Sequence, residues 1–304
     1  MNQNQRFLVA LSNTEHDVPV LQYARMLAEC QLGREFRFVH VPIPSNTSGA
    51  LQPVIPGNDL ATQLTREVES HFGVPPAGVS LSSHILEGER VDALLEFATR
   101  SRADVILLGH RQQRSGQRSL ARRLAMISPS SVWMVPQGAP LSVRRILAPV
   151  DFSKHSADSL GEAVSIAKAA GLDRCLALHV YFADNSGPSP EHDQAARQGQ
   201  EEAFQKFLAS MEQQPLQIET KIEEGSLPSR TILRIAREEA ADLIVMNTRG
   251  RRRAAAILLG SVTTQVMVET PVAILAVKHF GAAMGLFEVL KDSHFWQQSM
   301  PKSN

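Results

Sequence analysis

The 304-residue chain has little cysteine, few aromatic residues and no long apolar run. Its two cysteines, Cys30 and Cys175, lie far apart, which excludes a disulfide framework or a cysteine zinc site and is typical of a reducing compartment. The longest apolar runs reach only about seven residues, too few to span a bilayer. The N-terminal residues lack a basic segment followed by an apolar one, so we expect no signal peptide, no membrane association and a cytoplasmic location.

An excess of charge of either sign is also missing. The chain has 31 Lys and Arg and 31 Asp and Glu, a formal net charge of zero. Dedicated nucleic-acid-binding domains normally carry a basic excess. The stretch 111–123 is basic and free of acids, but no aromatic residues alternate with its arginines to stack on bases. No nucleic-acid partner is therefore expected.

The chain is instead built as an internal repeat. Its length suits two domains of about 100–200 residues each. Five segments of the first half recur in the same order in the second half, which makes a chance repeat very improbable. The pairs are 6–12 with 145–151, 38–41 with 178–180, 87–88 with 224–225, 103–108 with 241–246, and 131–135 with 271–275. We therefore expect domains at 1–138 and 139–280, followed by a tail at 281–304.

Each copy has the pattern of alternating strands and helices. Short apolar runs, typical of strands buried on both faces, occur at 7–11, 36–41, 105–108 and 132–135. Between such runs lie helical repeats, one of which stops at Gly171, and Asp17 is expected to cap the first helix with Pro19 in its first turn. Strands alternating with helices predict a parallel sheet covered by helices on both faces.

Ligands on such sheets bind at the carboxyl ends of the strands, near the point where the strand order reverses. Asp151 follows the first strand of the second copy. Its carboxylate can accept hydrogen bonds from an adenine amino group or a ribose hydroxyl. Capping the next helix is an equally good use of an Asp at this point, so position alone leaves both roles open.

A glycine-containing segment follows the fourth strand of the second copy. It reads Asn247-Thr-Arg249-Gly250, then nine residues, then Gly260-Ser261 at the start of the last helix. Gly250 lets the backbone approach a ligand closely, and a helix N-terminus is a ready anion site. Arg249 and the arginines at 251–253 add positive charge. This segment therefore predicts a phosphate site.

These residues resemble the ATP-binding branch of the universal stress protein family, whose signature is G-x-x-G, nine residues, then G-[S/T]. The resemblance covers residues 5–278, so the chain resembles a tandem universal stress protein. It departs at Asn247, which stands for the first glycine. Asn tolerates left-handed backbone angles well, so we expect the turn to survive, with the side chain crowding or replacing a phosphate contact.

The resemblance implies an α/β fold of two tandem five-stranded parallel-sheet domains, of the adenine nucleotide alpha hydrolase-like, Rossmann-like type. A pseudo-twofold axis would relate them, with their last strands, near 132–135 and 272–277, paired within one chain. These strands are apolar edges without charges that would keep a partner away. Whether the chain also forms a homodimer or binds another protein is left open.

The resemblance also implies one site for ATP or another adenine nucleotide, in the second copy, with any Mg²⁺ carried by the phosphates. The expected binding residues are Pro149, Val150, Asp151, Val180, Met246, Asn247, Arg249, Gly250, Gly260, Ser261, Val262 and Thr263. Asp151 and Val180 are expected to hold the adenosine, and the glycine segment the phosphates. No protein-built metal site is expected, because His110 and His155 near the predicted clefts have no second histidine, cysteine or carboxylate at ligand spacing.

The first copy departs further from the signature. Ser12 stands where the second copy has Asp151, and Gly109 is followed by His110-Arg111-Gln112, so the second glycine is lost. We expect this half to be structural. His40 and His179 hold equivalent positions in the two copies, which favours a buried structural role for both.

No catalytic motif accompanies the predicted site. The chain has no G-x-x-x-x-G-K-[S/T] loop and no G-x-S-x-G elbow. We therefore name no catalytic residue and expect nucleotide binding in a stress-response or signalling role. A slow ATPase or autokinase, and a nucleotide-independent interaction protein with vestigial sites, stay open. The tail is expected to form an amphipathic helix that packs on its own protein, or alternatively a partner-binding arm anchored by Trp296.

Overall fold

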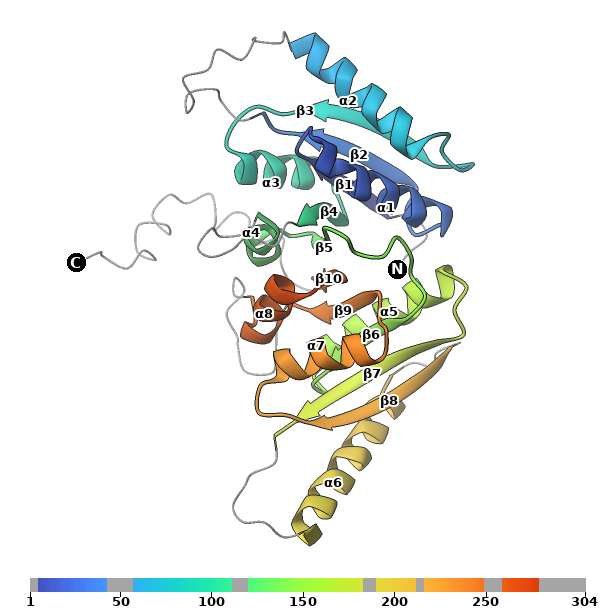
Figure 1. The fold of residues 1–304 in the computed structure, drawn as a ribbon, viewed down its shortest axis with the longest axis vertical. Helices are drawn as coiled ribbons and strands as arrows, with labels where there is room; N and C mark the ends of the chain where they lie inside the picture. The colour runs from blue at the N-terminus through green and yellow to red at the C-terminus, as the bar shows by residue number, and fades with distance from the viewer. Residues whose placement is uncertain are drawn as a thin grey trace, which may run out of the picture.

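The computed structural model describes residues 5–42, 57–110, 120–182, 190–211, 216–248 and 259–278. Its strands form one ten-stranded sheet in the order β3-β2-β1-β4-β5-β10-β9-β6-β7-β8 (Figure 1). The first five strands of the chain occupy one half of this sheet and the last five the other half. The repeat in the sequence is therefore a repeat in the fold.

The N-terminal half alternates strands and helices as expected. Its elements are β1 (Arg6–Leu11), the 3₁₀ turn Glu15–Asp17, α1 (Val18–Glu29), β2 (Glu35–His40), α2 (Gly57–Phe72), β3 (Ser80–Ile85), α3 (Arg90–Arg100), β4 (Val105–His110), α4 (Leu120–Ile127) and β5 (Ser131–Pro136). All neighbouring strands in this half are parallel. This confirms the predicted five-stranded parallel sheet.

The C-terminal half repeats the arrangement. Its elements are β6 (Ile146–Val150), α5 (Lys154–Ala169), β7 (Arg174–Tyr181), α6 (Pro190–Ala209), β8 (Gln217–Glu224), α7 (Pro228–Glu238), β9 (Leu243–Asn247), α8 (Ser261–Glu269) and β10 (Ala273–Val277). The strands are again parallel within the half. Gly171 follows α5 with a φ of 73°, as the expected helix stop requires.

The two halves join through their last strands. β5 and β10 pair antiparallel, with Trp133 opposite Leu275 and Met134 opposite Ile274. All four side chains are buried. Each apolar edge is thus covered by the other, which confirms the predicted pairing within one chain and gives the sheet its pseudo-twofold symmetry.

Helices cover both faces of the sheet. One apolar cluster packs α1, α2, α5 and α6 on one face, and contains Phe7, Trp133 and Leu275. A second cluster packs α3, α4, α7 and α8 on the other face, and contains Leu8 and Ile274. Each cluster has members from both halves. Consecutive strand residues such as Phe7 and Leu8 are therefore both buried, which explains why the strands read as unbroken apolar runs.

The Ala-Asp pair that marks the repeat fixes the start of the first strand in each half. The carboxylate of Asp104 accepts from the backbone N–H of Arg6 at 2.9 Å. That of Asp242 accepts from the N–H groups of Arg144 and Arg145 at 2.8 and 3.1 Å. The repeat thus preserves a contact and not only a pattern of apolar residues.

Candidate functional site

The carboxyl ends of β6, β7 and β9 lie side by side. β6 stands between β7 and β9 in the sheet, and all three strands are parallel. In this half β6 is the strand at which the order reverses, since its sheet neighbours follow it by one and by three strands in the sequence. Asp151 follows β6, Val180 lies near the end of β7 and Asn247 ends β9. The fold therefore brings the predicted adenosine and phosphate residues to one edge.

Asp151 is held by the serine two residues further on. Its Oδ1 accepts from the N–H of Ser153 at 3.1 Å and from the Ser153 hydroxyl at 2.6 Å. Ser153 is itself the N-cap of α5, because its Oγ accepts from the N–H of Ser156 at 3.1 Å. The helix-cap role left open for Asp151 thus belongs to Ser153. The Asp151 carboxylate stands at the strand end, partly exposed and oriented by that cap.

The residue after Asp151 has an unusual backbone. Phe152 has a φ of 61°, in the left-handed region that bulky residues rarely adopt. Its ring stacks on the imidazole of His179, with centroids 4.0 Å apart and planes at 25°. The rings of Phe204 and Phe207 on α6 lie 5.2 and 5.5 Å away. Sequence analysis missed this aromatic cluster. Phe204 and Phe207 lie about fifty residues after Phe152, and no sequence pattern shows that α6 packs at the end of β6.

His179 and its counterpart His40 are both buried and make the same contact. The Nδ1–H of His179 donates to the carbonyl oxygen of Val150 at 2.8 Å. That of His40 donates to the carbonyl oxygen of Leu11 at 3.1 Å. Burial lowers the pKa of His40, which favours its neutral ring. The expected buried structural role is confirmed for both histidines.

The start of α8 is fastened to the end of β9. The N–H of Gly260 donates to the carbonyl oxygen of Thr248 at 2.8 Å. The Thr263 hydroxyl donates to the carbonyl oxygen of Asn247, also at 2.8 Å. Ser261 is exposed and Val262 partly exposed at this helix start, whereas Thr263 is 4% exposed. The first N–H groups of a helix lack partners within it, so this end offers donors to an anion beside β9.

Asn247 does not occupy a left-handed turn, and the interpretation of its backbone from sequence was wrong. It is the last residue of β9 and pairs with Val277 of β10, so its backbone is extended. In the first half Gly109 is likewise inside β4, paired with Val135. A Cβ at Gly109 would lie 2.9 Å from Cγ2 of Val20. Helix packing, and not backbone angle, therefore requires the glycine in the first half.

Of the other expected residues, Pro149 is partly buried, while Val150 and Met246 are each 5% exposed. Pro149 and Val150 are the last two residues of β6, and Met246 is the second-last residue of β9. Arg249, Gly250 and the arginines at 251–253 lie outside the described residues, as do the tail at 281–304 and the basic residues 111–118. Their expected roles stay predictions.

The first half places a different carboxylate at its strand end. Oδ1 of Asp17 accepts from the N–H and the hydroxyl of Ser12 at 3.0 and 2.8 Å. Its Oδ2 accepts from the N–H of Thr14 at 3.2 Å. Asp17 holds the N-cap position of α1 with Pro19 in the first turn, as predicted, although its side chain makes no capping hydrogen bond to this helix. This carboxylate is 4% exposed and fastens the loop internally.

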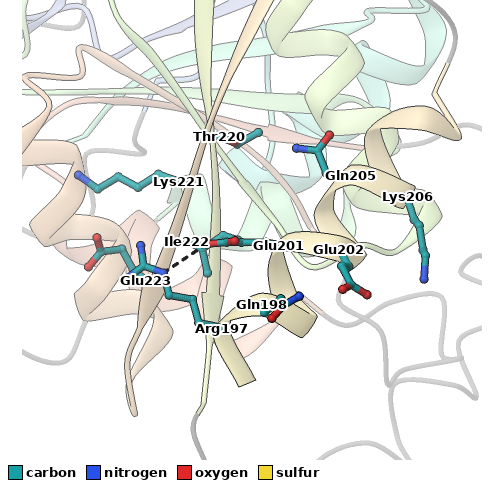
Figure 2. Close-up of a pocket in the computed structure, with 10 residues that line it drawn as sticks. All are labelled: Arg197, Gln198, Glu201, Glu202, Gln205, Lys206, Thr220, Lys221, Ile222 and Glu223. Atoms are coloured by element: carbon teal, nitrogen blue, oxygen red, sulfur yellow. Dashed lines mark hydrogen bonds and ion pairs between the residues drawn. The ribbon is translucent and has the colours of Figure 1, made fainter. Parts of the chain in front are cut away.

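A groove of about 870 Å³ lies elsewhere, between α6 and β8 (Figure 2). Its lining contains none of the expected nucleotide residues. It mixes acids with bases, and Arg197 and Glu201 form an ion pair of 3.4 Å within it. Neither its place nor its charge fits a nucleotide phosphate.

Within the described ranges, no group of three or more His, Cys, Asp or Glu side chains is arranged to hold a metal ion. Among the described helices, none combines the length and apolar character that crossing a membrane requires.

Comparisons with known proteins agree with the repeat. The model of the universal stress protein family matches residues 3–136 and again 142–278. A universal stress protein of Methanocaldococcus jannaschii is 29% identical over 143 residues, covering 44% of this chain and 82% of that protein. One of Thermus aquaticus is 31% identical over 137 residues, covering 44% of this chain and 98% of that protein.

Solved structures share the whole tandem fold. A Pseudomonas aeruginosa protein of unknown function matches with a TM-score of 0.67 at 18% identity, covering 95% of this chain and 98% of that one. A universal stress protein of Archaeoglobus fulgidus matches with a TM-score of 0.62 at 18% identity, covering 91% and 97%. Because the family model accounts for both halves in turn, the chain belongs to the universal stress protein family and contains two copies of its domain in tandem.

Proposed function

We propose that the C-terminal half binds ATP or another adenine nucleotide at the carboxyl ends of β6, β7 and β9, in a stress-response or signalling role. One observation carries the proposal. An oriented carboxylate, Asp151, and a fastened helix N-terminus, Gly260-Ser261, lie at the same edge of one parallel sheet. These are the two groups that a nucleoside and its phosphates require.

The adenosine would be held at the ends of β6 and β7. Asp151 accepts from a ribose hydroxyl or the adenine amino group, with its carboxylate already oriented by Ser153. Val180 offers a partly exposed apolar side chain. Pro149, Val150 and Met246, at the ends of their strands, are proposed to support Asp151 and Val180.

The phosphates would be held at the start of α8. The N–H groups of Ser261 and Val262, with the Ser261 hydroxyl, supply donors, while the Gly260 N–H, already bonded to Thr248, holds the helix start in place. Asn247, Arg249 and Gly250 are proposed to complete the cradle from the segment after β9. The buried Thr263 hydroxyl already donates to Asn247, so Thr263 would position the cradle. Any Mg²⁺ would be held mainly by phosphate oxygens, which suit this ion.

The first half is proposed to be structural. In the first half, Ser12 stands at the position equivalent to Asp151. Asp17 bonds to Ser12 and so holds this loop closed on itself. Several expectations stay predictions. They are the domain boundaries at 1–138 and 139–280, a cytoplasmic location, a homodimer and a protein partner. Slow ATP hydrolysis also stays a prediction, for which phosphate release lost in Asp151→Ala is the test.

One observation favours a second candidate, a nucleotide-independent interaction protein. Asn247 replaces the first glycine of the family signature and adds a side chain at the end of β9. Binding measurements separate the two candidates directly.

The test compares equivalent positions in the two halves. The purified protein is denatured and any released nucleotide is identified by mass. Stripped wild type, Asp151→Ala and Ser12→Ala are then titrated with ATP by calorimetry. The proposal expects binding in wild type and in Ser12→Ala, and its loss in Asp151→Ala. Absence of binding in wild type up to millimolar ATP would leave the interaction protein as the better account.

A further inference from the structure

We propose that His179 and Phe152 act together as positioning residues for Asp151, so that they set how tightly the nucleotide is held without contacting it. This inference rests on the proposed function and deepens it. Asp151 lies between Val150 and Phe152 in the sequence, and His179 contacts both of these neighbours.

The first contact fixes the strand before Asp151. The Nδ1–H of His179 donates to the carbonyl oxygen of Val150 at 2.8 Å, and the two residues stand opposite each other in the β6–β7 register. Val150 is 5% and His179 6% exposed. A buried hydrogen bond in a region of low dielectric is costly to lose, so the last peptide of β6 has little freedom.

The second contact fixes the residue after Asp151. Phe152 has a left-handed φ of 61°, which a bulky side chain adopts only when its surroundings compensate. The imidazole of His179 stacks on its ring at 4.0 Å, and Phe204 and Phe207 close the cluster at 5.2 and 5.5 Å. This turn in turn places Ser153, whose N–H and hydroxyl hold the Asp151 carboxylate.

The first half shows that the fold does not require an aromatic residue stacked on the histidine at this position. His40 makes the same bond to the carbonyl of Leu11 and stands opposite it in the register. The residue equivalent to Phe152 is Asn13, with nearly the same φ of 57°. Asn adopts this conformation with little strain, and Ser12 stands where the second half has Asp151. Of these two equivalent positions, the one beside the carboxylate carries the strained aromatic residue, which points to a role in positioning Asp151.

The test separates positioning from stability. Phe152→Asn installs the residue of the first half, relieves the left-handed strain and removes the stack. We expect it to fold with an unfolding midpoint within a few degrees of wild type and to bind ATP about tenfold more weakly, a size typical of coupled neighbours. His179→Phe keeps a ring but removes the donor, and is expected to weaken binding similarly. Its matched control, His40→Phe, removes the same bond in the first half and should lower stability without changing ATP affinity.

A double-mutant cycle tests whether the effect passes through Asp151. ATP affinity is measured for wild type, Phe152→Asn, Asp151→Asn and the double variant. The proposal expects Phe152→Asn to change affinity little once Asp151 is Asn. Unchanged affinity in Phe152→Asn, or an equal loss in both backgrounds, overturns the inference while the proposed function stands. If wild type does not bind ATP, the proposed function itself fails, and the inference fails with it.

Discussion

The hydroxyl of Thr263 donates to the carbonyl oxygen of Asn247 across 2.8 Å, so the first turn of α8 is bonded to the last residue of β9. The backbone bond from Gly260 to Thr248 closes the same junction at 2.8 Å. Together these contacts fix the helix end proposed to hold phosphates. The position of the cradle thus depends on a side chain that is itself buried.

Replacing Thr263 by Val removes this bond while keeping the shape of the side chain. The carbonyl of Asn247 loses the hydroxyl donor, so the free energy of unfolding should fall by about 1–2 kcal/mol, measured by denaturant titration. ATP affinity should fall as well. Thr263→Ser restores the hydroxyl and should recover both, and Thr264→Val on the partly exposed next residue is the control. Full ATP affinity in Thr263→Val would contradict the positioning role.

Gly109 is expected to be required by its packing against Val20. In Gly109→Ala the new methyl would lie 2.9 Å from Cγ2 of Val20, so either the Val20 side chain or α1 must shift. The free energy of unfolding should fall by about 1–3 kcal/mol. Adding Val20→Ala makes room for this methyl, so the double variant should lose less stability than the sum of the two single losses. Strict additivity in thermal or chemical unfolding would show that the steric account is wrong.

Trp133 is expected to be a main anchor of the junction between the halves. It is fully buried beside the β5–β10 pairing and meets the ring of Tyr23 edge-on at 5.8 Å. Trp133→Ala should lower the free energy of unfolding by about 3–5 kcal/mol. Leu141→Ala, at a side chain 45% exposed, is the control and should change little. Similar effects of both variants in denaturant titrations would contradict the importance of this junction.

Glu239 is expected to make stability depend on acid pH. Its carboxylate accepts from Lys221 at 2.7 Å and from Arg145 at 3.0 Å, and these partners lower its pKa below the ordinary value of 4.5. A lowered pKa in the folded state contributes stability above pH 4.5 that is lost as the pH falls through the folded pKa.

Glu239→Gln should therefore cost about 1 kcal/mol near neutral pH, since the partners are partly solvated, and nearly nothing well below the folded pKa. Denaturant titrations across this range measure the difference. The exposed Glu69 on α2 serves as control, with Glu69→Gln expected to track wild type. A cost that stays constant down to strongly acid pH would contradict the ion-pair account.

The architecture could be predicted because the repeat and the apolar runs encode it directly. The strands are buried on both faces, so segments such as 105–108 stand out. The pairing of the two apolar last strands was expected from the resemblance to the family, and the structure shows it. Asp151 could be found because it directly follows a strand. These inferences depend on neighbours in the sequence, on the repeat or, for the pairing of the last strands, on the family resemblance.

The details of the strand ends could not be predicted in the same way. The Asp17 carboxylate accepts a hydrogen bond from the Ser12 hydroxyl, and Gly109 packs against a methyl group of Val20 on α1. Both contacts depend on how α1 packs on the sheet. The stacking of Phe152 against His179 and α6 likewise joins three separate segments. Sequence spacing shows which residues reach the edge of the sheet, but not which of them bond to one another there.

The most direct test of the account is the stoichiometry of ATP binding to the stripped wild-type protein, measured by calorimetry. The account predicts one equivalent per chain, because only the C-terminal half presents both Asp151 and the Gly260-Ser261 helix start. The heat should disappear in Asp151→Ala and persist in Ser12→Ala. Two equivalents, or one equivalent that survives Asp151→Ala, would contradict the assignment of the site to the C-terminal half.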